Sequence, residues 1–83
     1  MVTVEILRWR MRRGVLELDH IFKSFLERNY GKLSEEDKQN IIKLLESQDP
    51  ELLEWLLYRS SLPNNIALKE AVMLILQDVD NNK

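Results

Sequence analysis

The sequence predicts an all-α protein, folded as a compact bundle of about five short helices. Apolar residues recur with helical spacing along the whole chain, and no segment alternates in the manner of a strand. Both prolines and both glycines fall between the periodic segments, where helices end or turn. With 83 residues, the chain is expected to form one domain over residues 1–83.

The first two helices are predicted on either side of Gly14, over about residues 3–12 and 15–29. Gly14 stands where the first helix should end, since glycine is the common residue just past a helix C-terminus. Tyr30-Gly31 is expected to close the second helix. The apolar residues that define the two stripes are Val4, Leu7 and Met11 in the first helix, and Leu18, Ile21, Phe22, Phe25 and Leu26 in the second.

Capping signals place the other three helices. Residues 34–37, Ser-Glu-Glu-Asp, resemble a capping box and start a third helix that fades at Ser47. Asp49-Pro50 predicts the start of a short fourth helix, with Asp49 as N-cap and proline in the first helical position. Residues 63–65, Pro-Asn-Asn, form the break and cap before the fifth helix, and residues 80–83 are predicted to be a frayed tail.

The charge is unevenly distributed. The net charge is -2, yet residues 1–14 carry four arginines against Glu5 and the remaining residues carry an excess of acids. The chain as a whole is therefore not a nucleic-acid polycation. No apolar run approaches the ~20 residues of a transmembrane helix, and no apolar stretch follows the basic residues as in a secretory signal. We therefore predict a cytoplasmic bacterial protein without a transmembrane segment.

Few residues could carry catalysis. The absence of cysteine excludes disulfides, thiolate metal sites, iron–sulfur clusters and a Cys nucleophile, and a single histidine excludes a multi-His metal site. His20 is expected to be an exposed or capping residue, because Asp19 beside it points to another face of the helix. Two glycines leave no room for a phosphate-binding loop. The sequence thus predicts no catalytic residue, no metal and no stably bound cofactor, in a protein that is not an enzyme.

The arginine cluster carries more information. Arg8 and Arg12 are four residues apart, and Arg10 and Arg13 are three apart, so a helix would present basic ridges around Trp9. Three interpretations remain open: a docking face for an acidic partner, since Arg and Trp are enriched in interface hot spots; a nucleic-acid contact; or a solvated helix face. The acidic remainder of the chain argues against nucleic acid.

The segment Arg13-Gly14-Val15-Leu16-Glu17 places a glycine directly after the basic helix. Because glycine has no Cβ, another backbone could approach closely here. Arg13 and Glu17 could pair with each other, or reach across to a partner. The alternative is a helix terminus with a surface ion pair, worth less than about 1 kcal/mol.

Arg13-Gly14-x-x-Glu17 matches the RGxxE motif, and at these residues the sequence resembles the succinate dehydrogenase flavinylation factors, called SdhE in bacteria. The resemblance extends over roughly residues 6–60. It rests on three blocks: Arg8-Trp9 with Arg12-Arg13-Gly14 and Glu17-Leu18-Asp19; Tyr30 through Leu33-Ser34 with Leu44-Leu45-Glu46; and Asp49-Pro50 with Leu52 and Trp55.

The resemblance implies a small helical chaperone and a partner. The partner would be the flavoprotein subunit of succinate dehydrogenase, and in some members that of fumarate reductase. The chaperone would promote covalent attachment of FAD, the client's cofactor, to a client histidine. Gly14 would permit close approach, Arg13 would hold the client surface and Glu17 would reach towards the flavin site. The surrounding dock would be Arg8, Trp9, Arg10 and Arg12. A monomer is expected; an antitoxin-like role and a nucleic-acid-binding role remain alternatives.

Overall fold

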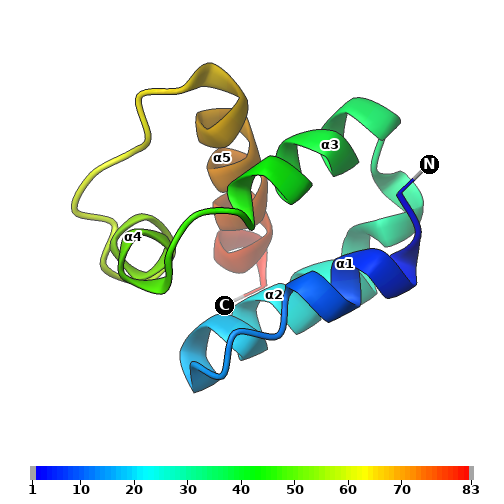
Figure 1. Ribbon diagram of the computed structural model, residues 1–83, viewed down its shortest axis with the longest axis horizontal. Helices are drawn as coiled ribbons and strands as arrows, with labels where there is room; N and C mark the ends of the chain where they lie inside the picture. Colours follow the sequence, from blue (N-terminus) through cyan, green and yellow to red (C-terminus); the bar gives the residue numbers. More distant parts are fainter. Residues whose placement is uncertain (1, 83) are drawn as a thin grey trace.

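Within residues 2–82, which it describes, the computed structural model contains five α-helices, a 3₁₀ turn and a π-helical segment (Figure 1). Their bounds are α1 Val4–Arg10, α2 Leu16–Asn29, η1 Tyr30–Lys32, α3 Glu35–Leu44, α4 Asp49–Leu53, η2 Glu54–Tyr58 and α5 Ile66–Asn81. The same range contains no strand, so the all-α prediction is confirmed.

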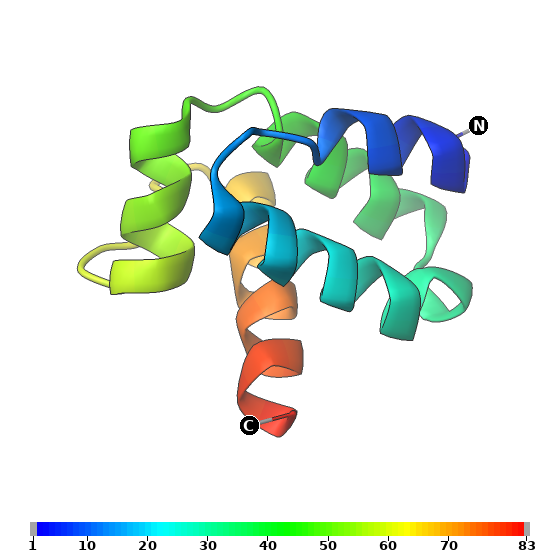
Figure 2. The same ribbon diagram turned by 90° about the horizontal axis from the view of Figure 1, so that it is seen from below.

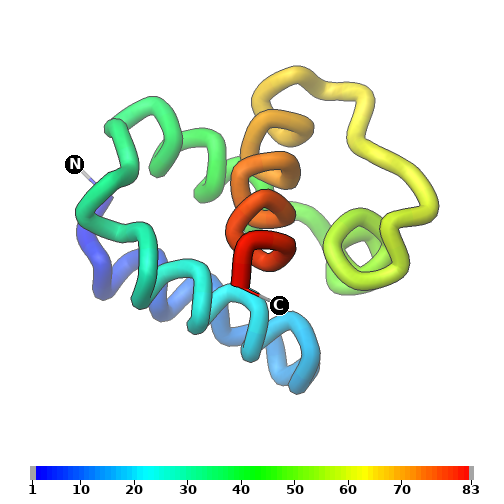
Figure 3. Tube along the Cα trace, turned by 180° about the vertical axis from the view of Figure 1, so that it is seen from behind, coloured from blue at the N-terminus to red at the C-terminus, as the bar shows by residue number. Residues whose placement is uncertain are grey.

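Helices α1 and α2 form an antiparallel pair that flanks the rest of the bundle (Figures 1 and 2). Helix α5 packs against α3, α2 and η2, and therefore joins the two halves of the fold. Helix α4 continues directly into η2, and a loop without helical structure leads from η2 back to α5, as the tube in Figure 3 shows. The Cα radius of gyration is 11.5 Å.

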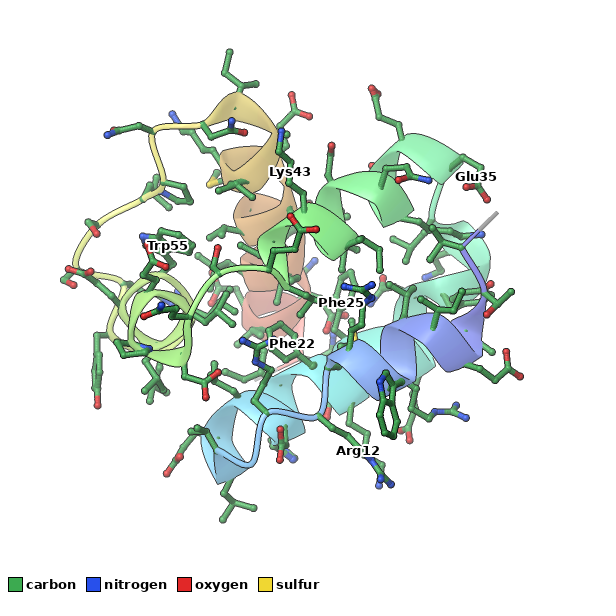
Figure 4. The ribbon with its side chains drawn as sticks, in the orientation of Figure 1. Arg12, Phe22, Phe25, Glu35, Lys43 and Trp55 are labelled. Carbon is green, nitrogen blue, oxygen red and sulfur yellow. The ribbon has the colours of Figure 1, made fainter. Side chains whose placement is uncertain are left out.

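The core lies where α2, α3, η2 and α5 meet. Phe22 and Phe25 of α2 point into it, whereas Arg12 points away from the body of the molecule (Figure 4). Each fully buried side chain of this size contributes about 1.5–3 kcal/mol relative to an exposed one. The other fully buried large side chains are Leu7, Leu18, Ile41, Leu44, Leu52, Leu56, Val72 and Ile75. The predicted stripe of α2 is confirmed, with Ile21 only partly buried at its margin.

Two of the predicted caps are confirmed and one is wrong. Ser34 Oγ accepts from the Asp37 amide at 3.0 Å, and Asp37 accepts in return from the Ser34 amide at 3.2 Å. Asn65 caps α5. The N-cap of α4, however, is Gln48 instead of Asp49, which is already helical. The Asp49 carboxylate instead accepts a hydrogen bond from Arg13 Nε at 2.8 Å.

The first helix is shorter than predicted. It ends at Arg10 with Met11 as C-cap, so Gly14 does not follow it directly but lies in the connection to α2. Gly14 has a φ of +78°, the left-handed conformation that residues with a Cβ adopt only at a cost. The left-handed conformation of Gly14 therefore belongs to the connection between α1 and α2 and not to the end of α1.

The C-terminal residues of α5 are held by two polar contacts. Arg59, which ends η2 with a φ of +56°, donates two hydrogen bonds to Asp80, at 2.8 and 3.3 Å. Asn82 donates to the Asp78 carbonyl at 2.9 Å. Helix α5 extends through Asn81, into the predicted tail, and Lys83 lies outside the described residues.

A buried carboxylate ties the end of α2 to the end of α5. Asp78 is only 9% exposed and accepts from Arg28 Nη2 at 2.8 Å and from Asn29 Nδ2 at 2.8 Å. The hydrogen bond from Arg28 is the main cause that lowers the pKa of Asp78 below its ordinary value; burial opposes it and Asn29 assists it. The same hydrogen bond raises the pKa of the Arg28 guanidinium.

We expect Asp78→Ala to lower the free energy of unfolding by about 1–3 kcal/mol at neutral pH, because Asn29 loses a charged acceptor. A carboxyl whose pKa is lowered by folding stabilises the protein above its unfolded pKa, and this stabilisation is lost as the pH falls through the folded value. The difference from the parent should therefore shrink in acid. Thermal melting at several pH values measures it, with the exposed Glu70→Ala of the same helix as control. Equal melting at pH 7 would contradict this expectation.

Candidate functional site

The candidate site is an exposed strip formed by α1, the connection that follows it and the first turn of α2. We call it the Arg–Trp surface. Its members are Arg8, Trp9, Arg10, Arg12, Gly14, Leu16 and Glu17, and all of them are exposed. The strip contains all but one of the residues that the sequence nominated. The exception is Arg13, whose side chain is directed towards Asp49 of α4.

Helix α1 is short and begins at a side-chain cap. Thr3 Oγ1 accepts from the Ile6 amide at 3.3 Å, and Glu5 lies in the first turn, where its charge complements the helix dipole. Arg8 and Arg10 occupy the last turn, where cations are favoured for the same reason. Leu7 is fully buried and fixes the helix against the core, so the next residues along the helix face outward.

Two large apolar side chains of the Arg–Trp surface are left in solvent. Trp9 is 75% exposed and Leu16 is 79% exposed. The sequence nominated Trp9 but not Leu16. The sequence could have indicated that Leu16 is exposed, because Leu16 falls outside the buried stripe of α2, which begins at Leu18. Tryptophan and arginine are the residue types enriched in the hot spots of protein–protein interfaces.

A groove of about 420 Å³ runs between α1 and α2 beside this surface. Arg8, Arg12 and Lys23 bring three cations to it, and Met11 and Leu26 contribute apolar atoms. Asp19 and Glu27 complete its lining. None of the three cations forms an ion pair with another residue in the range 2–82. Their charge is therefore available to an anionic partner.

Arg13 is turned inward. Its Nε donates to Asp49 Oδ1 at 2.8 Å, Nη1 donates to the Leu45 carbonyl at 2.7 Å, and Nη2 donates to the Ser47 carbonyl at 2.7 Å. The side chain is 18% exposed. Arg13 thus pairs with Asp49 and not with Glu17, one of the two possibilities that the sequence left open. Nothing in the spacing of the sequence indicated a partner in α4.

Gly14 and Glu17 face solvent at the start of α2. A Cβ built on Gly14 would meet no atom of the described chain within 4 Å, so space around this residue is open. Glu17 lies in the first turn of α2 and makes no ion pair with another described residue. The residue before α2, Val15, gives no side-chain cap, and Asp19 instead reaches back to accept from the Arg13 amide at 2.9 Å.

Outside this surface, His20 is exposed on α2, as predicted. In the part of the chain that is described, no three His, Cys, Asp or Glu side chains come together in a way that could hold a metal ion. None of the helices in residues 2–82 has the length and apolar character needed to cross a membrane.

The fold and the exposed residues define a small all-α protein with an exposed tryptophan and leucine near arginines that form no ion pair within the described residues. Residues 5–79 match the family described as flavinator of succinate dehydrogenase. The chain belongs to this family, and the match includes the segment Arg13–Glu17.

Individual relatives are named FAD assembly factors. The FAD assembly factor SdhE of Shewanella oneidensis is 42% identical over 64 residues, which are 77% of this chain and 78% of the relative. The protein of that name from Serratia is 42% identical over 69 residues, 83% of this chain and 77% of the relative. No solved structure matches the chain.

Proposed function

We propose that this protein binds the flavoprotein subunit of succinate dehydrogenase and promotes covalent attachment of FAD to a histidine of that subunit. The observation that carries the proposal is the Arg–Trp surface itself: the motif residues Gly14 and Glu17 and their neighbours are exposed together in a member of the flavinator family. The names of the SdhE relatives, which describe them as FAD assembly factors, support the same role.

The charge distribution supports a client with an acidic patch. Arg8, Arg10 and Arg12 lie on one strip of an otherwise acidic molecule, and none is paired within the described residues. Such a strip steers an acidic surface to one side of the protein and fixes its orientation. Trp9 and Leu16 then supply apolar area that is lost from water on contact.

In this proposal the chemistry belongs to the client, which holds both the histidine and the flavin. The factor acts by binding one arrangement of the client more tightly than others, and it can shift the client's population only by that difference in affinity. Holding the reacting groups in position removes part of the entropic cost of bond formation. Gly14 lets the client backbone approach, and Glu17 extends towards the client beside it.

The remaining assignments are part of the same proposal. The factor acts as a monomer in the bacterial cytoplasm, and the flavoprotein subunit of fumarate reductase is a second client. Bacterial relatives of similar length support the compartment. A radius of gyration of 11.5 Å supports a chain that folds without a partner, because about 12 Å is typical of a domain of this size.

Covalent flavin on the client tests the proposal. In cells lacking the factor, we expect expression of this protein to restore in-gel flavin fluorescence of the flavoprotein subunit and to allow its capture in a pulldown. His20→Ala should restore flavinylation to within a few-fold of the parent, because His20 is exposed and lies outside the Arg–Trp surface. Absence of both restoration and capture by the parent would contradict the proposed function. Complete loss with His20→Ala alone would contradict the assignment of the chemistry to the client.

A further inference from the structure

Among the motif residues Arg13, Gly14 and Glu17, Arg13 is the one whose side chain forms hydrogen bonds within the described part of the protein. Its guanidinium makes three short hydrogen bonds, to Asp49 Oδ1, the Leu45 carbonyl and the Ser47 carbonyl, at 2.8, 2.7 and 2.7 Å. These acceptors all belong to the junction between α3 and α4. The Arg13 side chain therefore spans from the connection that contains Gly14 to this junction. Each of the three guanidinium nitrogens donates to an acceptor within the protein and the side chain is only 18% exposed, so little of Arg13 is left for a client.

The backbone of Arg13 is bonded to a different element, helix α2. Its amide donates to Asp19 Oδ1 at 2.9 Å, from the first turns of α2. Arg13 therefore has its main chain fixed to α2 and its side chain fixed to the α3–α4 junction. The residue that follows is Gly14, whose φ of +78° is set by this same connection.

We infer that Arg13 and Asp49 are positioning residues for the client-binding connection, and that Asp49, which no part of the motif includes, is needed for client recognition. This inference rests on the proposed function. Asp49 lies in α4, and its carboxylate is directed to Arg13 instead of capping its own helix. A guanidinium suits this role because its planar fork can satisfy a carboxylate and two carbonyls at once, whereas a lysine ammonium presents a point charge.

Two views of Arg13 make opposite predictions. If Arg13 contacts the client, Arg13→Lys keeps the charge and should keep much of the affinity, and Asp49→Ala should have little effect. If Arg13 positions the connection, Arg13→Lys and Asp49→Ala should both weaken client binding by about 10- to 100-fold, the range expected when a binding group is displaced by about 1 Å. The Arg13→Ala/Asp49→Ala double variant should be no weaker than the worse single variant.

The matched control is Glu51→Ala. Glu51 is an acid in the same first turn of α4, and its carboxylate accepts from the Gln48 amide at 3.1 Å, so its removal disturbs α4 without touching Arg13. Affinity for the purified flavoprotein subunit should be measured for all variants at a temperature where each is folded by circular dichroism. We expect Glu51→Ala to bind like the parent. Equal weakening by Glu51→Ala and Asp49→Ala would overturn the inference, since the effect would then come from α4 as a whole.

A second readout needs no client. Hydrogen exchange at the Arg13 amide, which donates to Asp19 Oδ1 at 2.9 Å, should accelerate at least tenfold in Asp49→Ala and remain as in the parent in Glu51→Ala. Accelerated exchange with unchanged client affinity would overturn the role of Asp49 in recognition. Unchanged exchange would overturn the positioning role itself. Failure of the parent to bind the subunit would instead contradict the proposed function, and the exchange result would still decide whether Asp49 holds the connection.

Discussion

Gly14→Arg is expected to abolish covalent flavinylation of the client while the variant remains folded. A Cβ at Gly14 meets nothing within 4 Å in the described chain, so the substitution creates no clash inside the protein. The cost to folding comes from the φ of +78° and is about 1–2 kcal/mol. The loss of function comes from a long side chain where the client backbone would approach. Covalent flavin on the client, in cells lacking the parent factor, measures the loss.

Gly31→Arg is the control for this variant. Gly31 lies beyond the other end of α2, a Cβ there also meets nothing within 4 Å, and its φ is not positive. It should support flavinylation like the parent. A Gly14→Arg protein that still flavinylates the client fully would show that Gly14 is not at the contact. If it melts far below the parent, Gly14 is primarily a turn residue, and the functional assignment loses its main support.

Trp9→Ala should weaken binding of the flavoprotein subunit by about 2–4 kcal/mol, the range of an aromatic hot spot, and should leave thermal stability nearly unchanged. The indole is 75% exposed, so its removal takes little from the core. Titration of the labelled factor with purified subunit gives the two dissociation constants. The expected free energy corresponds to a loss of about 30- to 1,000-fold in affinity.

Tyr58 offers a matched comparison, because it is an aromatic residue that is 69% exposed, in η2 and outside the Arg–Trp surface. Tyr58→Ala should bind within about threefold of the parent, as expected for a residue that is not in the contact. Similar losses in both variants would mean that the client covers a different face or the whole molecule. Normal binding by Trp9→Ala would remove Trp9 from the docking surface.

Much of the fold was accessible from the sequence because its signals are local. The stripe of α2, the Ser34–Asp37 capping box and the Asn65 cap each depend on residues within one or two helical turns. The exposed position of most of the candidate surface followed from the same periodicity. Leu16 could have been added on that basis, since it falls outside the stripe.

The missed polar pairings involve residues far apart in the chain. The local preference of Asp for the N-cap predicted that role for Asp49, but an arginine 36 positions earlier takes its carboxylate. Arg13 likewise faces away from Glu17, its nearest opposite charge in the motif. Asp78 follows Ile75 on the buried stripe of α5, which could have suggested a buried carboxylate, but not that Arg28 and Asn29 would satisfy it. Such pairings depend on tertiary packing, which spacing alone does not determine.

The ion pairs near the two ends of α2, Arg13–Asp49 and Arg28–Asp78, have a consequence for synthesis of the chain. Arg13 cannot form its ion pair until Asp49, 36 residues later in the chain, has been synthesised. Arg28 likewise requires Asp78, which is 50 residues later. Contacts of this separation require long loops to close and therefore form late in folding. The segment that would meet the client leaves the ribosome first, yet both ends of α2 are secured only when almost the whole chain has emerged. If the proposed function holds, a factor truncated before Asp78 is therefore expected to bind the client more weakly than the complete chain.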